Sequence, residues 1–139
     1  MIRLIDIAGR TGQAPVRSLF SLAVGSDDDH VLQPHEIRYR NDQHHVLYGL
    51  YDDDLLLGVI GLARDPAADT VEIRHLAVTG GEGEFERVRQ MIEHVLSRQR
   101  QRTASWQTPE SLREIAEEIG FRFSDCRQGS EIGILQLLR

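Results

Sequence analysis

Residues 55–96 constrain the fold more than any other part of this chain. Two runs rich in apolar residues, LLLGVIGLARD and TVEIRHLAV, are followed by the glycine-rich TGGEGE and by FERVRQMIEHVL, whose apolar residues recur every three or four positions. This order predicts two β-strands, a tight loop and an amphipathic helix. A strand that passes through glycines into the first turn of a helix leaves backbone N–H groups free for an anion. The segment therefore predicts a strand–loop–helix unit able to bind a phosphate group.

Hydrophobic periodicity predicts further strands and helices around this unit. Strands are expected over residues 2–7, 45–51, 55–64, 70–78, 103–107, 121–125 and 132–138, and helices over residues 14–24, 34–40, 85–102 and 109–119. Pro34 is expected to open the second helix, Thr108 to cap the last one and Gly120 to end it. Short polar turns predict an antiparallel meander over the strands of residues 45–78. We therefore expect a single α/β (mixed α+β) domain over residues 1–139, whose central, twisted, mostly antiparallel sheet of six or seven strands has helices on both faces.

Charge and hydropathy argue against two classes of partner. The net charge is −6, with aspartates clustered at residues 27–29 and 52–54. A nucleic-acid backbone would be repelled by this surface, whereas a cationic amine would be attracted; the aspartate clusters also fit simple solvated turns. The apolar runs are too short to span a bilayer and the first residues lack a signal-peptide core, so neither a nucleic acid nor a membrane is an expected partner.

Cysteine, histidine and arginine content add three expectations. Cys126 is the only cysteine and cannot form an internal disulfide, which suits a reducing, cytoplasmic compartment; on a strand it is expected to be a small core residue. His30, His35, His44 and His45 lack a spacing that would bring ligands together, so no metal site is expected. All 16 basic residues are arginine, which indicates a GC-rich coding bias and a bacterial source.

Two motifs resemble the GNAT superfamily of acyl-CoA-dependent N-acetyltransferases. VEIRHLAV (residues 71–78) is similar to the fourth strand of that family, and SLREIAEEIGF (residues 111–121) is similar to its later helix, which ends in Gly-Phe. The order of elements also resembles the GNAT fold over essentially the whole chain. The resemblance implies acetyl-CoA as co-substrate, with its pantetheine arm paired to the backbone of Leu76, Ala77 and Val78.

The loop after this strand departs from the family pattern. In the family it reads Arg/Gln-x-x-Gly-x-Gly/Ala, and its amides bind the pyrophosphate; glycines let the backbone approach the phosphates. In register, those three positions hold Gly83, Glu86 and Val88. One interpretation is a shortened loop; the other is that cofactor binding has weakened or been lost. A shortened loop would bind the pyrophosphate through Gly80, Gly81, Gly83, Glu84 and Phe85.

Carboxylates in this loop oppose a dianionic ligand. Glu82, Glu84 and Glu86 lie within five residues, and like charges a few ångströms apart cost on the order of 1 kcal/mol each even when partly solvated. Arg87 and Arg89 could offset part of this repulsion if they fold back over the loop.

The resemblance also identifies candidate catalytic residues. Glu72 lies where several family members keep a glutamate base that deprotonates the amine. His75, on the same strand, is a second candidate base because its ordinary pKa suits neutral pH; backbone amides of residues 76–78 could stabilise the oxyanion. The tyrosine that protonates the leaving thiolate in the family is absent, since Ala116 occupies that region. The side chains of Glu72 and His75 also fit purely structural roles on a strand.

These observations predict an N-acetyltransferase that transfers an acetyl group to a primary amine of a small molecule or peptide. The glutamates in the loop and the missing tyrosine leave a second hypothesis open, a GNAT-fold binding or regulatory module without turnover. A third hypothesis is a plain α+β domain in which the strand–loop–helix unit is only structural. A homodimer is compatible with the resemblance.

Overall fold

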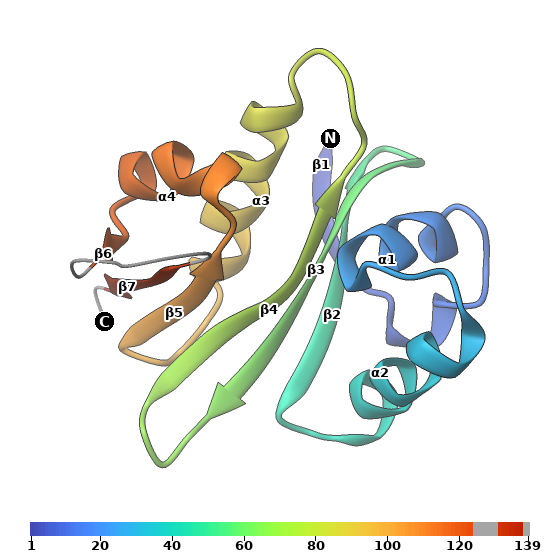
Figure 1. Cartoon of the computed structure of the whole chain (residues 1–139), viewed down its shortest axis with the longest axis horizontal. Coiled ribbons are helices and arrows are strands. Elements are labelled where there is room, and N and C mark those ends of the chain that lie inside the picture. Colours follow the sequence, from blue (N-terminus) through green and yellow to red (C-terminus); the bar gives the residue numbers. More distant parts are fainter. Residues whose placement is uncertain (124–130, 138–139) are drawn as a thin grey trace.

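A seven-stranded sheet forms the centre of the computed structural model, which describes residues 1–123 and 131–137 (Figure 1). The strands are β1 (Ile2–Asp6), β2 (His45–Asp52), β3 (Leu55–Asp65), β4 (Thr70–Val78), β5 (Thr103–Thr108), β6 (Arg122–Phe123) and β7 (Glu131–Gln136). Their order across the sheet is β1-β2-β3-β4-β5-β7-β6, and every neighbouring pair is antiparallel except β4 and β5. The expected mixed, mostly antiparallel sheet is confirmed.

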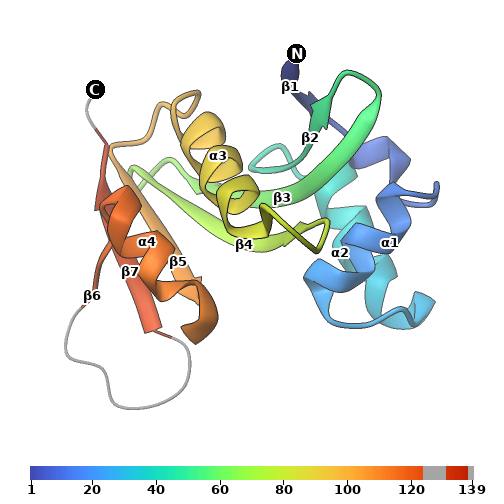
Figure 2. The same cartoon turned by 90° about the horizontal axis from the view of Figure 1, so that it is seen from above.

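Helices cover both faces of this sheet, as Figure 2 shows from above. The α-helices are α1 (Val16–Val24), α2 (Asp29–Asn41), α3 (Glu84–Leu96) and α4 (Arg113–Ile119), and two short 3₁₀ segments are η1 (Ala8–Arg10) and η2 (Glu110–Leu112). α1 and α2 pack on one face, and α3 and α4 pack on the other. None of the described helices is long and apolar enough to cross a bilayer.

Strand β3 contributes to a separate hydrophobic core on each face. Its neighbouring residues Val59 and Ile60 are both fully buried, Val59 with Phe20 of α1 and Ile60 with Met91 of α3. Successive strand residues point to opposite faces, so a strand covered on both sides needs an unbroken apolar run. This explains why residues 55–63 lack the alternation of a half-exposed strand.

β4 and β5 separate after a short parallel ladder. Their pairing begins at Thr70 and Thr103 and stops at Ile73 and Trp106. β4 then continues to Val78 paired only with β3, and β5 continues to Thr108 paired only with β7. We call this divergence, visible in Figure 1, the β4–β5 split. It leaves one edge of the second half of β4 without a neighbouring strand.

A β-bulge in β4 changes which side chains share a face. Gly61 pairs with His75 but the next residue of β3, Leu62, pairs with Ile73, so Arg74 is an extra residue. Before the bulge, Ile73 packs in the core beneath α3, which places Glu72 on the opposite face. After it, His75 contacts rings of α1 and α2. Glu72 and His75 therefore lie on the same face, although they are three positions apart in the sequence.

Helix α2 begins earlier than the sequence predicted. We expected Pro34 to open it, but the helix starts at Asp29, and the Asp28 carboxylate accepts a hydrogen bond of 2.8 Å from the His30 amide. Asp28 is thus a side-chain N-cap, and Asp29 forms an ion pair with Arg17. The aspartate cluster starts a helix as well as being exposed, and Pro34 lies inside the helix.

Two other expected helix ends are corrected. α3 does not reach residue 102 but ends at Leu96, because Ser97 Oγ donates to the His94 carbonyl and Gln99 Nε2 to the Val95 carbonyl. Thr108 does not cap the last helix: it ends β5, and its hydroxyl donates to the Trp106 carbonyl at 3.0 Å.

The end of the last helix is as expected. Gly120 ends α4, and its amide donates to the Ala116 and Glu117 carbonyls. The expectations for Cys126 and for the turn at residues 127–130 fall outside the described residues.

Candidate active site at the β4–β5 split

A cavity of about 350 Å³ lies at the β4–β5 split. β4 lines it with residues 72–76, β5 and the turn after it with Trp106, Gln107 and Pro109, and Ala23 and Leu112 complete the wall. Both candidate bases, Glu72 and His75, are among these residues. The structure therefore brings them together at the point where the sheet opens.

The backbone of β4 turns unpaired groups toward this opening. The Thr79 amide donates to the Leu57 carbonyl at 2.8 Å, and hydrogen-bonded pairs alternate along an antiparallel ladder. Ala77 therefore bonds to β3, whereas Leu76 and Val78 direct their N–H and C=O groups away from β3, where β5 has already diverged. Of the three residues expected to pair with the pantetheine arm, Leu76 and Val78 therefore have free backbone N–H and C=O groups, and Ala77 does not.

His75 is held by a tyrosine of α2, the helix that packs on the same face of the sheet. Its Nδ1 lies 2.5 Å from the Tyr39 hydroxyl of α2, and the two rings meet edge to face. The His35 ring, also of α2, lies 4.8 Å from the His75 ring. The bulge in β4 makes these contacts possible because it turns His75 toward α2.

The surroundings keep this pair uncharged at neutral pH. Burial, together with smaller contributions from His35, Arg74 and Arg38, lowers the pKa of His75 to about 4. Burial raises the pKa of the Tyr39 hydroxyl above its ordinary value of 10.0. At pH 7 a neutral imidazole therefore bonds to a neutral phenol.

Gly61 makes room for the tyrosine. A Cβ atom at this position would lie 2.0 Å from the Tyr39 hydroxyl oxygen and 2.5 Å from the adjacent ring carbon. Gly61 is also the residue of β3 that pairs with His75. The missing side chain at Gly61 thus lets Tyr39 reach the histidine across the strand.

Replacing Gly61 by alanine is expected to lower the free energy of unfolding by about 1–3 kcal/mol, because the methyl group displaces a buried ring. The Tm should fall by several degrees in differential scanning calorimetry. Gly12→Ala is the matched control, since a Cβ at Gly12 meets nothing within 4 Å. Equal melting temperatures for the two variants would contradict this account of Gly61.

Glu72 has a more open environment than His75. Its carboxylate Oε1 lies 3.3 Å from a guanidinium nitrogen of Arg74, and about half of its side chain, 46%, is exposed. An exposed ion pair of this kind contributes little to stability. The carboxylate is therefore accessible for proton transfer at the wall of the cavity.

The loop after β4 is short. α3 begins at Glu84, so residues 79–83 alone join it to β4, and Gly81 and Gly83 have φ values of 100° and 82°. Such left-handed conformations favour glycine. The amides of residues 80–83 and of Phe85 bond to no described residue, whereas the Glu84 amide donates to the Gly81 carbonyl at 3.2 Å. The loop is therefore short, and Glu84 is not a free donor in it.

The Arg87 side chain forms hydrogen bonds to carbonyl oxygens of this loop. Its guanidinium donates to the carbonyls of Thr79 at 2.6 Å, Glu82 at 2.9 Å and Gly80 at 3.3 Å. These bonds use acceptors and leave the loop's amide donors available. Arg87 thus folds back over the loop, which is the condition for offsetting part of the repulsion. Arg89 does not, because it pairs with Glu118 at 2.6 Å.

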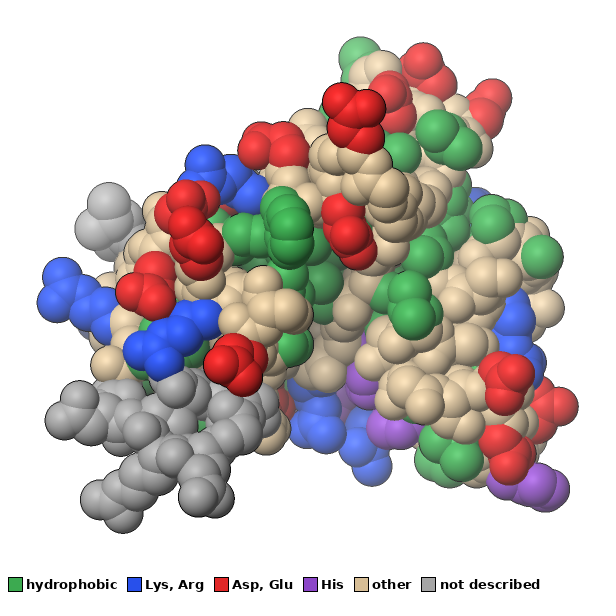
Figure 3. Space-filling model, turned by 45° about the horizontal axis from the view of Figure 1, so that its top comes forward, with side chains coloured by type: hydrophobic (Ala, Val, Ile, Leu, Met, Phe, Trp, Pro, Cys, Tyr) green, Lys and Arg blue, Asp and Glu red, His purple; other side chains and the backbone are tan. Residues whose placement is uncertain are grey.

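Acidic side chains surround the same loop. Glu82, Glu84 and Glu86 are all exposed. In Figure 3, Asp and Glu side chains gather toward the top of the view. The negative field expected from the sequence is therefore present, and Arg87 is the cation that contacts the loop directly.

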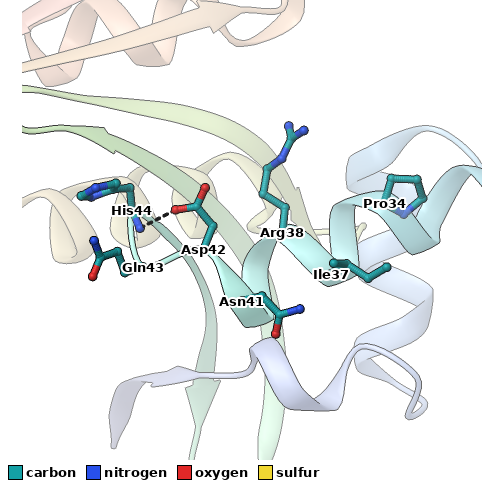
Figure 4. Close-up of a pocket in the computed structure, with 7 residues that line it drawn as sticks. All are labelled: Pro34, Ile37, Arg38, Asn41, Asp42, Gln43 and His44. Carbon is teal, nitrogen blue, oxygen red and sulfur yellow. Dashed lines mark hydrogen bonds between the residues drawn. The ribbon is translucent and has the colours of Figure 1, made fainter.

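A larger hollow lies elsewhere and lacks the chemistry of the split. It measures about 790 Å³ and runs along the end of α2, from Pro34 to His44 (Figure 4). The drawn side chains diverge, and the one bond drawn joins the Asp42 carboxylate to the His44 amide at 2.8 Å. No group of three metal-binding side chains occurs within residues 1–123 and 131–137. We therefore place the candidate site at the split.

Sequence reasoning missed Tyr39 and Gly61. Leu32 and Tyr39 are seven residues apart and both buried on α2, a helical spacing that could have predicted a buried tyrosine. Its partner lies 36 residues away, a distance that local periodicity does not address.

Solved structures with this architecture cover the whole chain. An acetyltransferase from Bacillus subtilis in complex with CoA shares 20% identity at a TM-score of 0.67, covering 99% of this chain and 100% of its own. An IAA acetyltransferase from Bacillus cereus shares 16% sequence identity at a TM-score of 0.64, and the match covers 99% of this chain and 100% of that protein. An N-acetyltransferase from Campylobacter jejuni in complex with acetyl coenzyme A shares 13% sequence identity at a TM-score of 0.66, and the match covers 98% of this chain and 99% of that protein.

Neither a family model nor a curated protein matches the sequence. The assignment therefore depends on three-dimensional likeness along the full length, together with the β4–β5 split. The chain has the fold of the GNAT superfamily of acetyltransferases.

Proposed function

We propose that this protein is an N-acetyltransferase that transfers the acetyl group of acetyl-CoA to a primary amine of a small molecule or peptide. The observation that carries the proposal is the β4–β5 split, where Leu76 and Val78 have unpaired backbone groups and Leu76 lines a cavity that also contains the Glu72 carboxylate. An extended pantetheine arm carries amides that can pair with such an open strand edge, as a further strand does.

The loop between β4 and α3 is the proposed site for the pyrophosphate. The free amides of residues 80–83 and of Phe85 lie beside the start of a 13-residue helix, where the helix dipole favours negative charge. Arg87 keeps the loop carbonyls turned away from these amides and supplies positive charge. This arrangement offsets part of the repulsion from the three glutamates.

The chemistry requires a base and a stabilised oxyanion. Glu72 removes a proton from the ammonium group, directly or through a water, so that the amine nitrogen can attack the thioester carbonyl. The carbon–nitrogen bond forms, the nitrogen gives up its second proton to water, the carbon–sulfur bond breaks, and the thiolate leaves. Backbone amides at the open edge of β4 stabilise the oxyanion. Ala116 is fully buried and carries no acid, so the thiolate receives no proton from that position.

The structural neighbours support the cofactor. Two of them are described with CoA or acetyl coenzyme A bound, and their chains align with at least 98% of this one. The acidic loop supports a second candidate function, a CoA-binding module without turnover, because the carboxylates of Glu82, Glu84 and Glu86 weaken the site for a dianion.

Calorimetric titration with acetyl-CoA, followed by thiol release across a panel of amines, tests both candidates. Arg87→Ala should weaken acetyl-CoA binding about tenfold or more, since it removes charge-assisted bonds that order the loop. Arg89→Ala, two residues along the same helix and paired with Glu118, is the control and should bind normally. Binding without thiol release would favour the binding module, and no binding would refute the proposed function.

A further inference from the structure

The bond between Tyr39 and His75 determines which nitrogen of the histidine carries the proton. Tyr39 is 4% exposed, and its hydroxyl bonds to His75 Nδ1 and to no other described group. A buried O–H needs an acceptor, and a neutral imidazole has one donor nitrogen and one acceptor nitrogen. If Nδ1 were the donor, the tyrosine hydrogen would be left without a partner. Nδ1 therefore accepts, and the proton lies on Nε2.

The Nε2 atom is accessible and has no partner among the described residues. It bonds to no described residue, and it is absent from the buried unpaired polar atoms of the described chain, which are His45 Nδ1 and Gln101 Oε1. His75 also lines the cavity at the split. A residue with an accessible N–H group thus lines the cavity in which the proposed function places the thioester.

We propose that His75 is a hydrogen-bond donor to the thioester carbonyl oxygen, fixed in this role by Tyr39, and not the base. This inference rests on the proposed function and assigns the two candidate side chains different tasks. Glu72 takes the proton of the amine. His75 keeps its own proton throughout and stabilises the oxygen on which negative charge develops.

The electrostatic surroundings support a donor over a base. Arg38, Arg74 and His35 all disfavour a positive charge on the ring, and burial disfavours it more strongly. A base must become cationic when it accepts a proton, which these groups oppose. A neutral donor undergoes no change of charge, and its N–H polarises a carbonyl.

Tyr39 is a positioning residue in this scheme. It contacts His75 and not the cavity, and Gly61 provides the space that lets it do so. Because Tyr39 acts through the histidine, Tyr39→Phe should change the proton position on the ring and lower kcat while leaving KM nearly unchanged.

Nuclear magnetic resonance of the His75 ring nitrogens tests the proton position on the free wild-type protein at pH 7. We expect a protonated Nε2 and an unprotonated, hydrogen-bonded Nδ1, and in Tyr39→Phe a mixture of tautomers with a higher His75 pKa. A proton on Nδ1 in the wild type would overturn the proposal. This measurement needs no acetyl-CoA, so a protein that fails to bind the thioester would refute the proposed function separately.

Kinetics of two replacements test the chemical role. The amide of glutamine can donate a hydrogen bond but cannot act as a base at neutral pH. His75→Gln should therefore keep kcat within about tenfold of wild type, whereas His75→Ala should lose about 10²–10³-fold. His30→Gln, at an exposed site at the start of α2, is the control. Equal, severe losses in His75→Gln and His75→Ala would overturn the donor role and identify a base.

Discussion

Glu72→Gln is expected to lower kcat for acetyl transfer by about 10²–10⁴-fold, the usual contribution of a general base. Glutamine keeps the size and shape of the side chain but cannot accept the proton of the ammonium group. The affinity for acetyl-CoA should stay close to that of wild type, because Glu72 lies in the cavity wall and not in the loop of residues 79–83. Steady-state kinetics and calorimetry measure the two effects separately.

Glu114→Gln is a suitable control for this experiment. Glu114 is exposed on α4, outside the residues that line the cavity at the split. Its replacement should change neither kcat nor affinity. If Glu72→Gln turned over as fast as Glu114→Gln, Glu72 would not be the base.

Acidification from pH 6.5 to pH 4 is expected to lower the free energy of unfolding by up to about 3 kcal/mol through His75. Its pKa is about 4 in the folded protein and near 6.5 when unfolded, so between these values the unfolded chain binds more protons. Stability therefore rises with pH across this window and the contribution is constant above it. Urea unfolding at a series of pH values measures the slope.

His75→Gln should make this dependence shallower because glutamine does not titrate. His35 adds a contribution of the same sign, since burial lowers its pKa also, so a smaller slope should remain. An unchanged slope in His75→Gln would show that His75 does not have the lowered pKa on which its neutral state depends.

The sequence predicted the architecture because apolar runs and turn residues mark the strands clearly. The bounds of β4, Thr70–Val78, match the expectation, since a polar turn precedes it and glycines follow it. The start of α2 was wrong because Pro34 is a strong helix-start signal, while the true cap, Asp28, lies in an acidic run that also fits a turn.

The candidate site was only partly predictable. Glu72, His75 and the open edge of β4 follow from a motif within eight consecutive residues. The bulge at Arg74 could not be predicted, because alternation assigns Glu72 and His75 to opposite faces and only the pairing with β3 shows otherwise. The Tyr39–His75 bond depends on packing between α2 and the sheet, which no local pattern encodes.

The negatively charged loop shows how a local pattern can be correct and incomplete. Its carboxylates are exposed as expected, but the glycine conformations and the Arg87 bonds keep amide donors free. Arg87 lies eight residues after Thr79, and no sequence pattern indicates that its side chain contacts the loop. Only the first turn of α3 brings its guanidinium back to the carbonyls.

Amide hydrogen exchange along β4, with and without acetyl-CoA, tests the central claim most directly. In the free protein the amides of Leu76 and Val78 should exchange fast, because they are unpaired, while the amide of Ala77 is protected by β3. Acetyl-CoA should slow exchange at Leu76 and Val78 and leave Ala77 nearly unchanged. If saturating acetyl-CoA left Leu76 and Val78 as fast as before, the thioester would not bind at the β4–β5 split.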